Sequence, residues 1–195
     1  MIVAHLAARD FERQPWKNGG GFTTQLAAWP REGRPTWRVS VADVAASGPF
    51  SDFSGYDRTI VLLEGAGMLL RFDAAPEARI ERRWQPFAFD GAWRTECELL
   101  GGPVRDLNLI VDREAARGTV EVLLPRPAVE RPLRADWTLV YVLSGGLAAR
   151  VGDAGHRLEI GEALRIDGSG DERLSLSSDG IDPAAAMVEI RTLRR

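Results

Sequence analysis

The sequence predicts an all-β protein of two small antiparallel β-barrels of the jelly-roll type in one chain. Short apolar stretches with a period of two recur along the 195 residues. Glycine or proline separates almost all of these stretches. Helical periodicity is scarce, and we expect at most one helical turn, at 113–117. Many short strands with this spacing are typical of sandwiches and barrels.

The expected strands are justified in chain order by their side-chain pattern. Residues 37–44 alternate, so that Trp37 and Val39 share one face and Arg38 and Ser40 the other. Residues 59–64 form a short apolar run with β-branched side chains, which favours a buried strand. The remaining expected strands are 106–112, 119–124, 138–143, 147–151, 163–167 and 187–193.

A proline-rich segment at 125–132 divides the chain. It holds three prolines in eight residues, and proline fixes φ and lacks a backbone donor. We therefore expect an extended segment outside any central strand. It separates an N-terminal barrel, residues 1–124, from a C-terminal barrel, residues 125–195, with strands that the two can exchange.

The two halves contain similar units. TIVLLEGAGMLLRF, from Thr59, resembles LVYVLSGGLAARV, from Leu139: each is an apolar strand, a glycine turn and a second strand. Downstream, PFAFDG at 86–91 matches EALRIDG at 162–168. This order of strands and glycine turns is typical of cupin barrels, and the repeat predicts a bicupin.

Composition excludes several classes of protein. Lys and Arg number 25 and Asp and Glu 28, a net charge of −3, which disfavours nucleic acid as a partner. Cys97 is the only cysteine, so an intrachain disulfide is excluded and a reducing cytoplasm is expected. The N-terminus lacks a secretory pattern and no run of 18 apolar residues occurs, so we expect no membrane partner.

The histidines do not predict a metal site. The chain has two histidines, and no HxH motif occurs. We expect His5 on a strand and His156 in a hairpin loop. Imidazole is the preferred nitrogen ligand of the metals that cupins hold, and the acidic residues form no tight cluster. We therefore expect no metal and no other cofactor.

The stretch PWKNGGGFTTQL, residues 15–26, is the first candidate for binding. Its glycines permit close backbone approach. Trp16 supplies a flat apolar wall, Lys17 a mobile cation and Asn18 an amide. The alternative is a glycine-rich turn with a solvated lysine.

Two further stretches place polar groups among apolar neighbours. If the face of Arg58 lines a barrel, Arg58 and Glu64 lie inside and need partners. Arginine there can bind a carboxylate bidentately; the alternative is an ion pair with Asp57 or Glu64. Asp106 and Asn108 share one strand face, where buried polar groups meet each other or a ligand.

Several of these motifs together resemble the HutD/Ves family of bicupins. They are PWKNGGGFT at 15–23, the stretch 37–58, LLEGAGMLL at 62–70, PFAFDG at 86–91 and DLNLIVDR at 106–113. The C-terminal half matches mainly as a cupin repeat. The resemblance implies a metal-free bicupin linked to control of histidine utilisation in bacteria, or to stress responses for Ves-like members.

From the residues and the resemblance together, we expect a protein that binds a small carboxylate metabolite, such as urocanate or N-formylglutamate, and modulates histidine utilisation. A protein-interaction or stress-response module is the second hypothesis. A metal-independent isomerase or hydrolase using buried carboxylates is the third, and no catalytic residue is assigned. The sequence does not decide between a monomer and a homodimer. The expected ligand-binding residues are Trp16, Lys17, Asn18, Ser40, Arg58, Glu64, Asp106 and Asn108.

Overall fold

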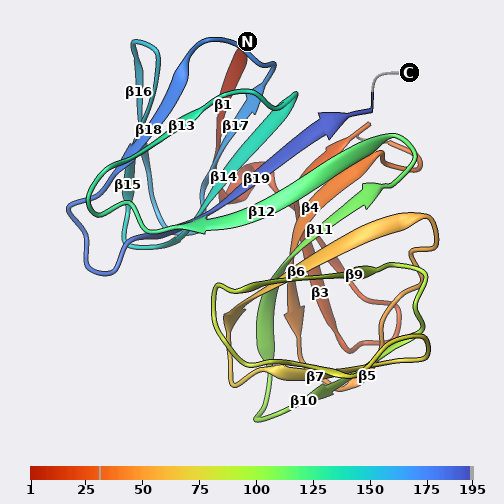
Figure 1. Ribbon diagram of the computed structural model, residues 1–195. Coiled ribbons are helices and arrows are strands. Elements are labelled where there is room, and N and C mark those ends of the chain that lie inside the picture. The colour runs from red at the N-terminus through yellow and green to blue at the C-terminus, as the bar shows by residue number, and fades with distance from the viewer. Residues whose placement is uncertain (31, 194–195) are drawn as a thin grey trace. The chain divides into compact units, whose positions relative to one another are not determined.

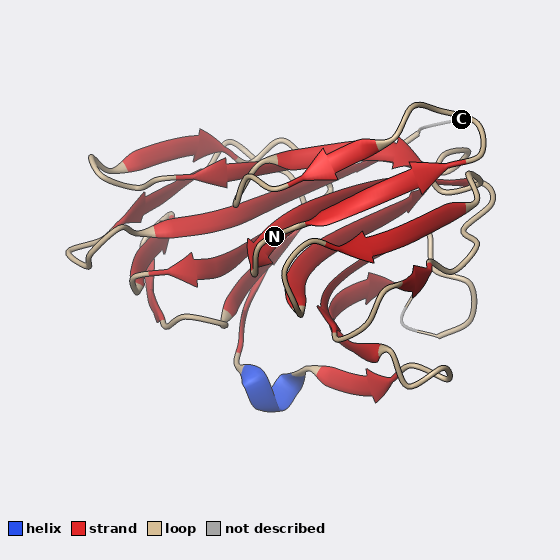
Figure 2. Ribbon diagram, turned by 90° about the horizontal axis from the view of Figure 1, so that it is seen from below, coloured by secondary structure: helices blue, strands red, loops and turns tan. Residues whose placement is uncertain are grey.

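A computed structural model describes residues 1–30 and 32–193 of the chain and confirms the all-β bicupin fold (Figures 1 and 2). Its one helical element is a 3₁₀ turn, η1 (Ala8–Asp10), within the described residues. The chain divides into two compact units, Phe11–Arg117 and a second unit that joins Met1–Asp10 to the chain from Gly118 onward. This division differs from the sequence-based boundary at residue 124, and Met1–Asp10 joins the second unit because Ile2–Leu6 pairs with residues 163–167.

The unit Phe11–Arg117 consists of two antiparallel sheets. The six-stranded sheet has the order β2 (Glu12–Pro15), β3 (Gly21–Trp29), β4 (Trp37–Val44), β11 (Val104–Asp112), β6 (Tyr56–Glu64), β9 (Pro86–Asp90). The four-stranded sheet has the order β5 (Gly48–Pro49), β10 (Thr95–Leu99), β7 (Met68–Phe72), β8 (Ala78–Ile80). Inward-facing apolar side chains of both sheets form one core.

The second unit repeats this plan. Its five-stranded sheet has the order β1 (Ile2–Leu6), β17 (Ala163–Asp167), β14 (Trp137–Ser144), β19 (Ala184–Thr192), β12 (Ala116–Leu123). Its four-stranded sheet has the order β13 (Val129–Pro132), β18 (Arg173–Ser177), β15 (Leu147–Val151), β16 (Ala154–Leu158). β1 pairs with β17, Ile2 opposite Asp167, and the proline-rich β13 lies at a sheet edge.

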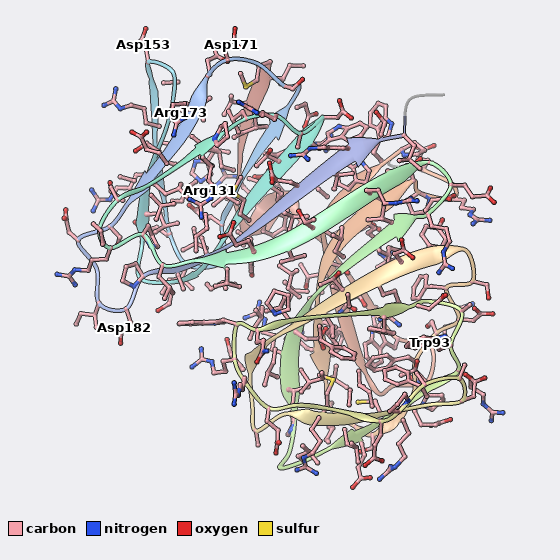
Figure 3. The ribbon with its side chains drawn as sticks, viewed as in Figure 1. Trp93, Arg131, Asp153, Asp171, Arg173 and Asp182 are labelled. Atoms are coloured by element: carbon pink, nitrogen blue, oxygen red, sulfur yellow. The ribbon has the colours of Figure 1, made fainter. Side chains whose placement is uncertain are left out.

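Two local expectations are wrong. His156 lies on β16 and not in a hairpin loop, because the β15–β16 hairpin turns earlier, at Gly152 (φ +56°) and Asp153, which Figure 3 shows at its tip. Residues 113–115 form a single hydrogen-bonded turn rather than a helical turn, since Ala115 N–H donates to Asp112 C=O at 3.1 Å and β12 then begins at Ala116. None of the helices in the described ranges is long and apolar enough to cross a membrane.

Candidate functional site

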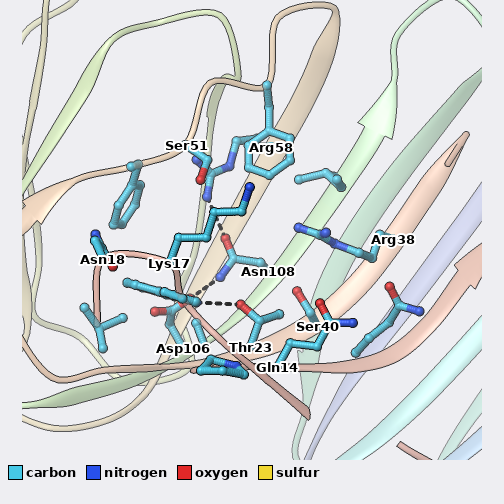
Figure 4. Close-up of a pocket in the computed structure, with 18 of the residues that line it drawn as sticks. Gln14, Lys17, Asn18, Thr23, Arg38, Ser40, Ser51, Arg58, Asp106 and Asn108 are labelled. Atoms are coloured by element: carbon cyan, nitrogen blue, oxygen red, sulfur yellow. Dashed lines mark hydrogen bonds between the residues drawn. The ribbon is translucent and has the colours of Figure 1, made fainter. Parts of the chain in front are cut away.

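A cavity of about 660 Å³ opens within the unit Phe11–Arg117 (Figure 4). Its walls come from β3, β4, β6 and β11, with residues 14–18, 49–51 and 53 also lining it. Of the eight residues expected to bind a ligand, the cavity brings together seven: Trp16, Lys17, Asn18, Ser40, Arg58, Asp106 and Asn108.

Strand alternation explains why these side chains share the cavity. Ser40 and Arg38 alternate with apolar residues on β4, and Asn108 and Asp106 do the same on β11. Asn108 pairs directly with Ser40 across the two strands. Arg58 on β6 pairs with Ile110, which is one pleat from Asn108 on the same face of β11. Diagonal neighbours at this spacing are within reach of a long side chain.

Glu64 is the expected residue that the structure does not place in the cavity. A β-bulge separates Asp106, which pairs with Leu62, from Arg105, which pairs with Glu64. Because Arg105 faces away from the cavity, Glu64 opposite it also faces away. Its side chain is 64% exposed and lies 3.6 Å from Arg105 (Oε1 to Nη1).

Arg58, Asn108 and Asp106 form a short hydrogen-bonded row in the cavity (Figure 4). The Arg58 Nη2 donates to Asn108 Oδ1 at 2.9 Å. The Asn108 Nδ2 in turn donates to Asp106 Oδ1. Arg58 is 7% exposed and Asp106 1% exposed. Both ends of the row retain an unused polar atom, since Arg58 Nε and Asp106 Oδ2 have no hydrogen-bond partner among the described residues.

The ion pairs considered for Arg58 are not observed in the described part of the chain. Asp57 lies 3.3 Å from Arg113 Nε instead, and Glu64 lies beside Arg105. The Arg58 guanidinium packs against aromatic rings, its Cζ being 5.1 Å from the Phe50 centroid. The Phe53 and Phe89 rings lie at 5.0 and 4.7 Å. These contacts stabilise a cation but neutralise no charge.

Burial shifts the pKa values of the cavity's charged groups. It raises the pKa of Asp106 to about 7, although Arg58 opposes this shift. It lowers the pKa of Arg58 to about 10, against the effect of Asp106, and it also lowers the pKa of Arg38. Below neutral pH the protonated form of Asp106 therefore predominates, and Arg38, Arg58 and Lys17 leave the cavity with an excess of positive charge.

The glycine-rich loop shapes the cavity mouth. Gly19 has φ +71°, and Trp16 N–H donates to Gly21 C=O at 2.9 Å, which closes the loop. A Cβ on Gly21 would lie 2.2 Å from the Asp43 carbonyl oxygen. Trp16 Nε1 donates to Thr23 Oγ1 at 2.8 Å, while Lys17 and Asn18 stay exposed. Glycine thus allows the close approach that positions Trp16.

Sequence analysis did not select several lining residues. Arg38 shares the cavity face of β4 with Ser40, so strand alternation alone could have identified it. Phe50 and Phe53 line the cavity from the segment after β5, and no sequence periodicity marks that segment. Gln14, Thr23 and Gln25 add amide and hydroxyl groups.

The described ranges contain no group of three or more His, Cys, Asp or Glu side chains able to hold a metal ion. His5 Nε2 lies 2.8 Å from Glu162, and both residues belong to the second unit. Burial raises the pKa of Cys97 to about 12, so its thiolate is disfavoured. The chemistry that the cavity supports is charge pairing and hydrogen bonding to an anion.

A family model described as HutD matches residues 8–182. The chain belongs to the HutD family. It is 38% identical over 180 residues to an uncharacterised 21.2 kDa protein in the hutC 3′ region of Pseudomonas putida, covering 90% of this chain and 92% of the relative. It is 33% identical over 143 residues to protein Ves of Cronobacter sakazakii, covering 70% and 75%.

The structure of HutD from Pseudomonas fluorescens SBW25 is similar to this chain, with a TM-score of 0.86, 30% identity and coverage of 99% and 100%. A conserved protein of unknown function from Pseudomonas aeruginosa PAO1 gives 0.90 at 34% identity, with the same coverage. The nickel complex of the pirin YhhW from Escherichia coli, at 10% identity and 0.71, shares the fold alone; it covers 96% and 98%.

Proposed function

We propose that this HutD-family protein binds a small carboxylate metabolite in the cavity of the unit Phe11–Arg117 and thereby modulates histidine utilisation. One observation carries the binding proposal: the buried Arg58 guanidinium faces the cavity and makes no ion pair among the described residues. The link to histidine utilisation is supported by the hutC 3′ region and HutD relatives.

A ligand carboxylate would compensate the cost of this arrangement. A buried charge without a counter-ion is costly, and guanidinium binds carboxylate with paired hydrogen bonds. A second cation, Arg38, lies on the same wall. The volume of about 660 Å³ is in the range of small-molecule sites, and Phe50, Ala42 and Ile110 offer apolar contact to the rest of a metabolite.

Calorimetric titration of the purified protein with histidine, urocanate, N-formylglutamate, glutamate and formate tests the proposal. We expect saturable binding of at least one of the four metabolites, with formate as a minimal carboxylate for comparison, because Arg58 lines the cavity without a carboxylate partner in the described ranges. Arg58→Ala should weaken this binding at least about tenfold, the size expected for loss of a charge-assisted hydrogen bond.

Arg82→Ala is the matched control, because Arg82 is exposed, lies in the same unit and does not line the cavity. Its Kd should equal that of the wild type. Arg38→Ala and Lys17→Ala remove the other two cavity cations, and we expect each to reduce affinity less than Arg58→Ala does. They keep the proposal testable if Arg58→Ala does not fold. Binding of none of the four metabolites, or an unchanged Kd in all three cavity variants, would contradict the proposal.

A further inference from the structure

The hydrogen-bond row has only one possible direction. Arginine can only donate, so the Asn108 atom that faces Arg58 must be its carbonyl Oδ1. The Asn108 amide nitrogen therefore faces Asp106 and donates to Oδ1. Oδ1 of Asp106 is thus an acceptor. Because the carbonyl oxygen is the better acceptor of a carboxylic acid, a proton on this carboxyl group is favoured on the other oxygen, Oδ2.

Asp106 Oδ2 is the atom that lacks a partner. Asp106 lines the cavity and is 1% exposed, and no described residue donates to Oδ2 or accepts from it. An unsatisfied buried oxygen is costly, and native structures normally give it a partner. Because Arg58 and Asp106 line one cavity, a ligand bound to Arg58 is the natural partner.

We infer that Asp106 binds the ligand carboxylate as a neutral acid, donating its Oδ2 proton, so that binding above neutral pH takes up one proton. This inference deepens the proposed function and rests on it for the identity of the ligand. Two ionised carboxylates side by side in a buried site would repel each other. A proton between them turns that repulsion into a strong, charge-assisted hydrogen bond.

Burial, more than the surrounding charges, accounts for this protonation of Asp106. Asp43, on neighbouring β4, opposes its ionisation and helps to raise its pKa, whereas Arg58, on β6, favours ionisation. Cys97, on β10, is a thiol whose pKa burial raises to about 12, so it adds no charge beside Asp106. Arg38 of β4, Lys17 of the glycine-rich loop and Glu12 of β2 also line the cavity. Burial outweighs these charges, so that Asp106 has a pKa of about 7.

Sodium formate is the probe, because it is a minimal carboxylate that stays ionised throughout the pH range used. Calorimetry is performed at constant ionic strength in Tris and in triethanolamine, whose ionisation enthalpies differ and whose cations do not compete for an anion site. The enthalpy difference gives the number of protons exchanged. We expect uptake approaching one proton above neutral pH and a Kd that rises up to about tenfold per pH unit there.

Asp106→Asn and Asp43→Asn are the paired variants. An amide at position 106 would accept from Asn108 through its oxygen and donate from the former Oδ2 position, so its Kd should not vary with pH. Asp43 lies outside the cavity, and Asp43→Asn should keep the proton uptake but shift its onset to lower pH, because the Asp43 charge helps to raise the pKa of Asp106. The number of protons taken up on formate binding is measured on the wild-type protein. The inference therefore stays testable even if Asp106→Asn does not fold.

The outcomes separate the two proposals when histidine, urocanate, N-formylglutamate and glutamate are titrated alongside formate. A metabolite that binds without proton uptake overturns the role of Asp106 and leaves the proposed function standing. Formate binding with proton uptake, but no metabolite binding, supports Asp106 and overturns the proposed function. Absence of binding by every compound overturns both.

Discussion

At the scale of single residues, Asp106 links stability to pH. Its pKa is about 3.8 unperturbed and about 7 in the folded chain. Between these values the folded state binds more protons than the unfolded state, so the free energy of unfolding falls as pH rises. Urea titrations between about pH 4.5 and about pH 7.5 should show that the free energy of unfolding falls more steeply with pH for the wild type than for Asp106→Asn. Parallel pH profiles would contradict the burial-driven shift.

Gly21 is the residue where backbone packing restricts the side chain most directly. A methyl group there would lie 2.2 Å from the Asp43 carbonyl oxygen, which leaves no room for alanine. Gly21→Ala should cost about 1–3 kcal/mol and should weaken ligand binding, because the loop holds Trp16 and Lys17. Gly48→Ala is the control, since nothing lies within 4 Å of the place its Cβ would take. Equal denaturation midpoints for the two variants would count against this account.

At the scale of elements, alternation and short apolar runs predicted eight strands, and the structure has a strand at each of these places. Three expected strands, 37–44, 147–151 and 163–167, have the observed bounds. The bulge opposite Asp106 could not be predicted, since it depends on the register with a strand over 40 residues away in sequence. Alternation extended across that bulge therefore placed Glu64 inside. The segment with Phe50 and Phe53 lies outside regular strands, where no period guides prediction.

Glu64→Gln tests the consequence of the bulge. Since Glu64 is exposed and faces away from the cavity, the variant should bind the same ligand with an unchanged Kd. Loss of its surface ion pair with Arg105 should change stability by less than about 1 kcal/mol. Calorimetry and urea denaturation measure the two quantities. A Kd raised by Glu64→Gln as much as by Arg58→Ala would place Glu64 at the ligand after all.

At the scale of the whole molecule, each of the two units has a hydrophobic core of its own. Leu176 is fully buried in the core of the second unit, and Leu176→Ala should cost about 2–5 kcal/mol without changing Kd below the unfolding transition. Leu70 belongs to the core that includes the cavity residues Ala42 and Val44. Leu70→Ala should therefore affect both stability and affinity. Weaker binding in Leu176→Ala would show that the site depends on the second core.

The pairing of β1 with β17 has a consequence for synthesis on the ribosome. β1 leaves the ribosome first, but its partner Asp167 is translated 165 positions after Ile2. At about 5–20 residues per second, β1 waits roughly 8–30 s for its partner. During this interval all strands of the unit Phe11–Arg117 become available to one another. The cavity-bearing barrel can thus complete itself on the nascent chain while the first strand is still unpaired.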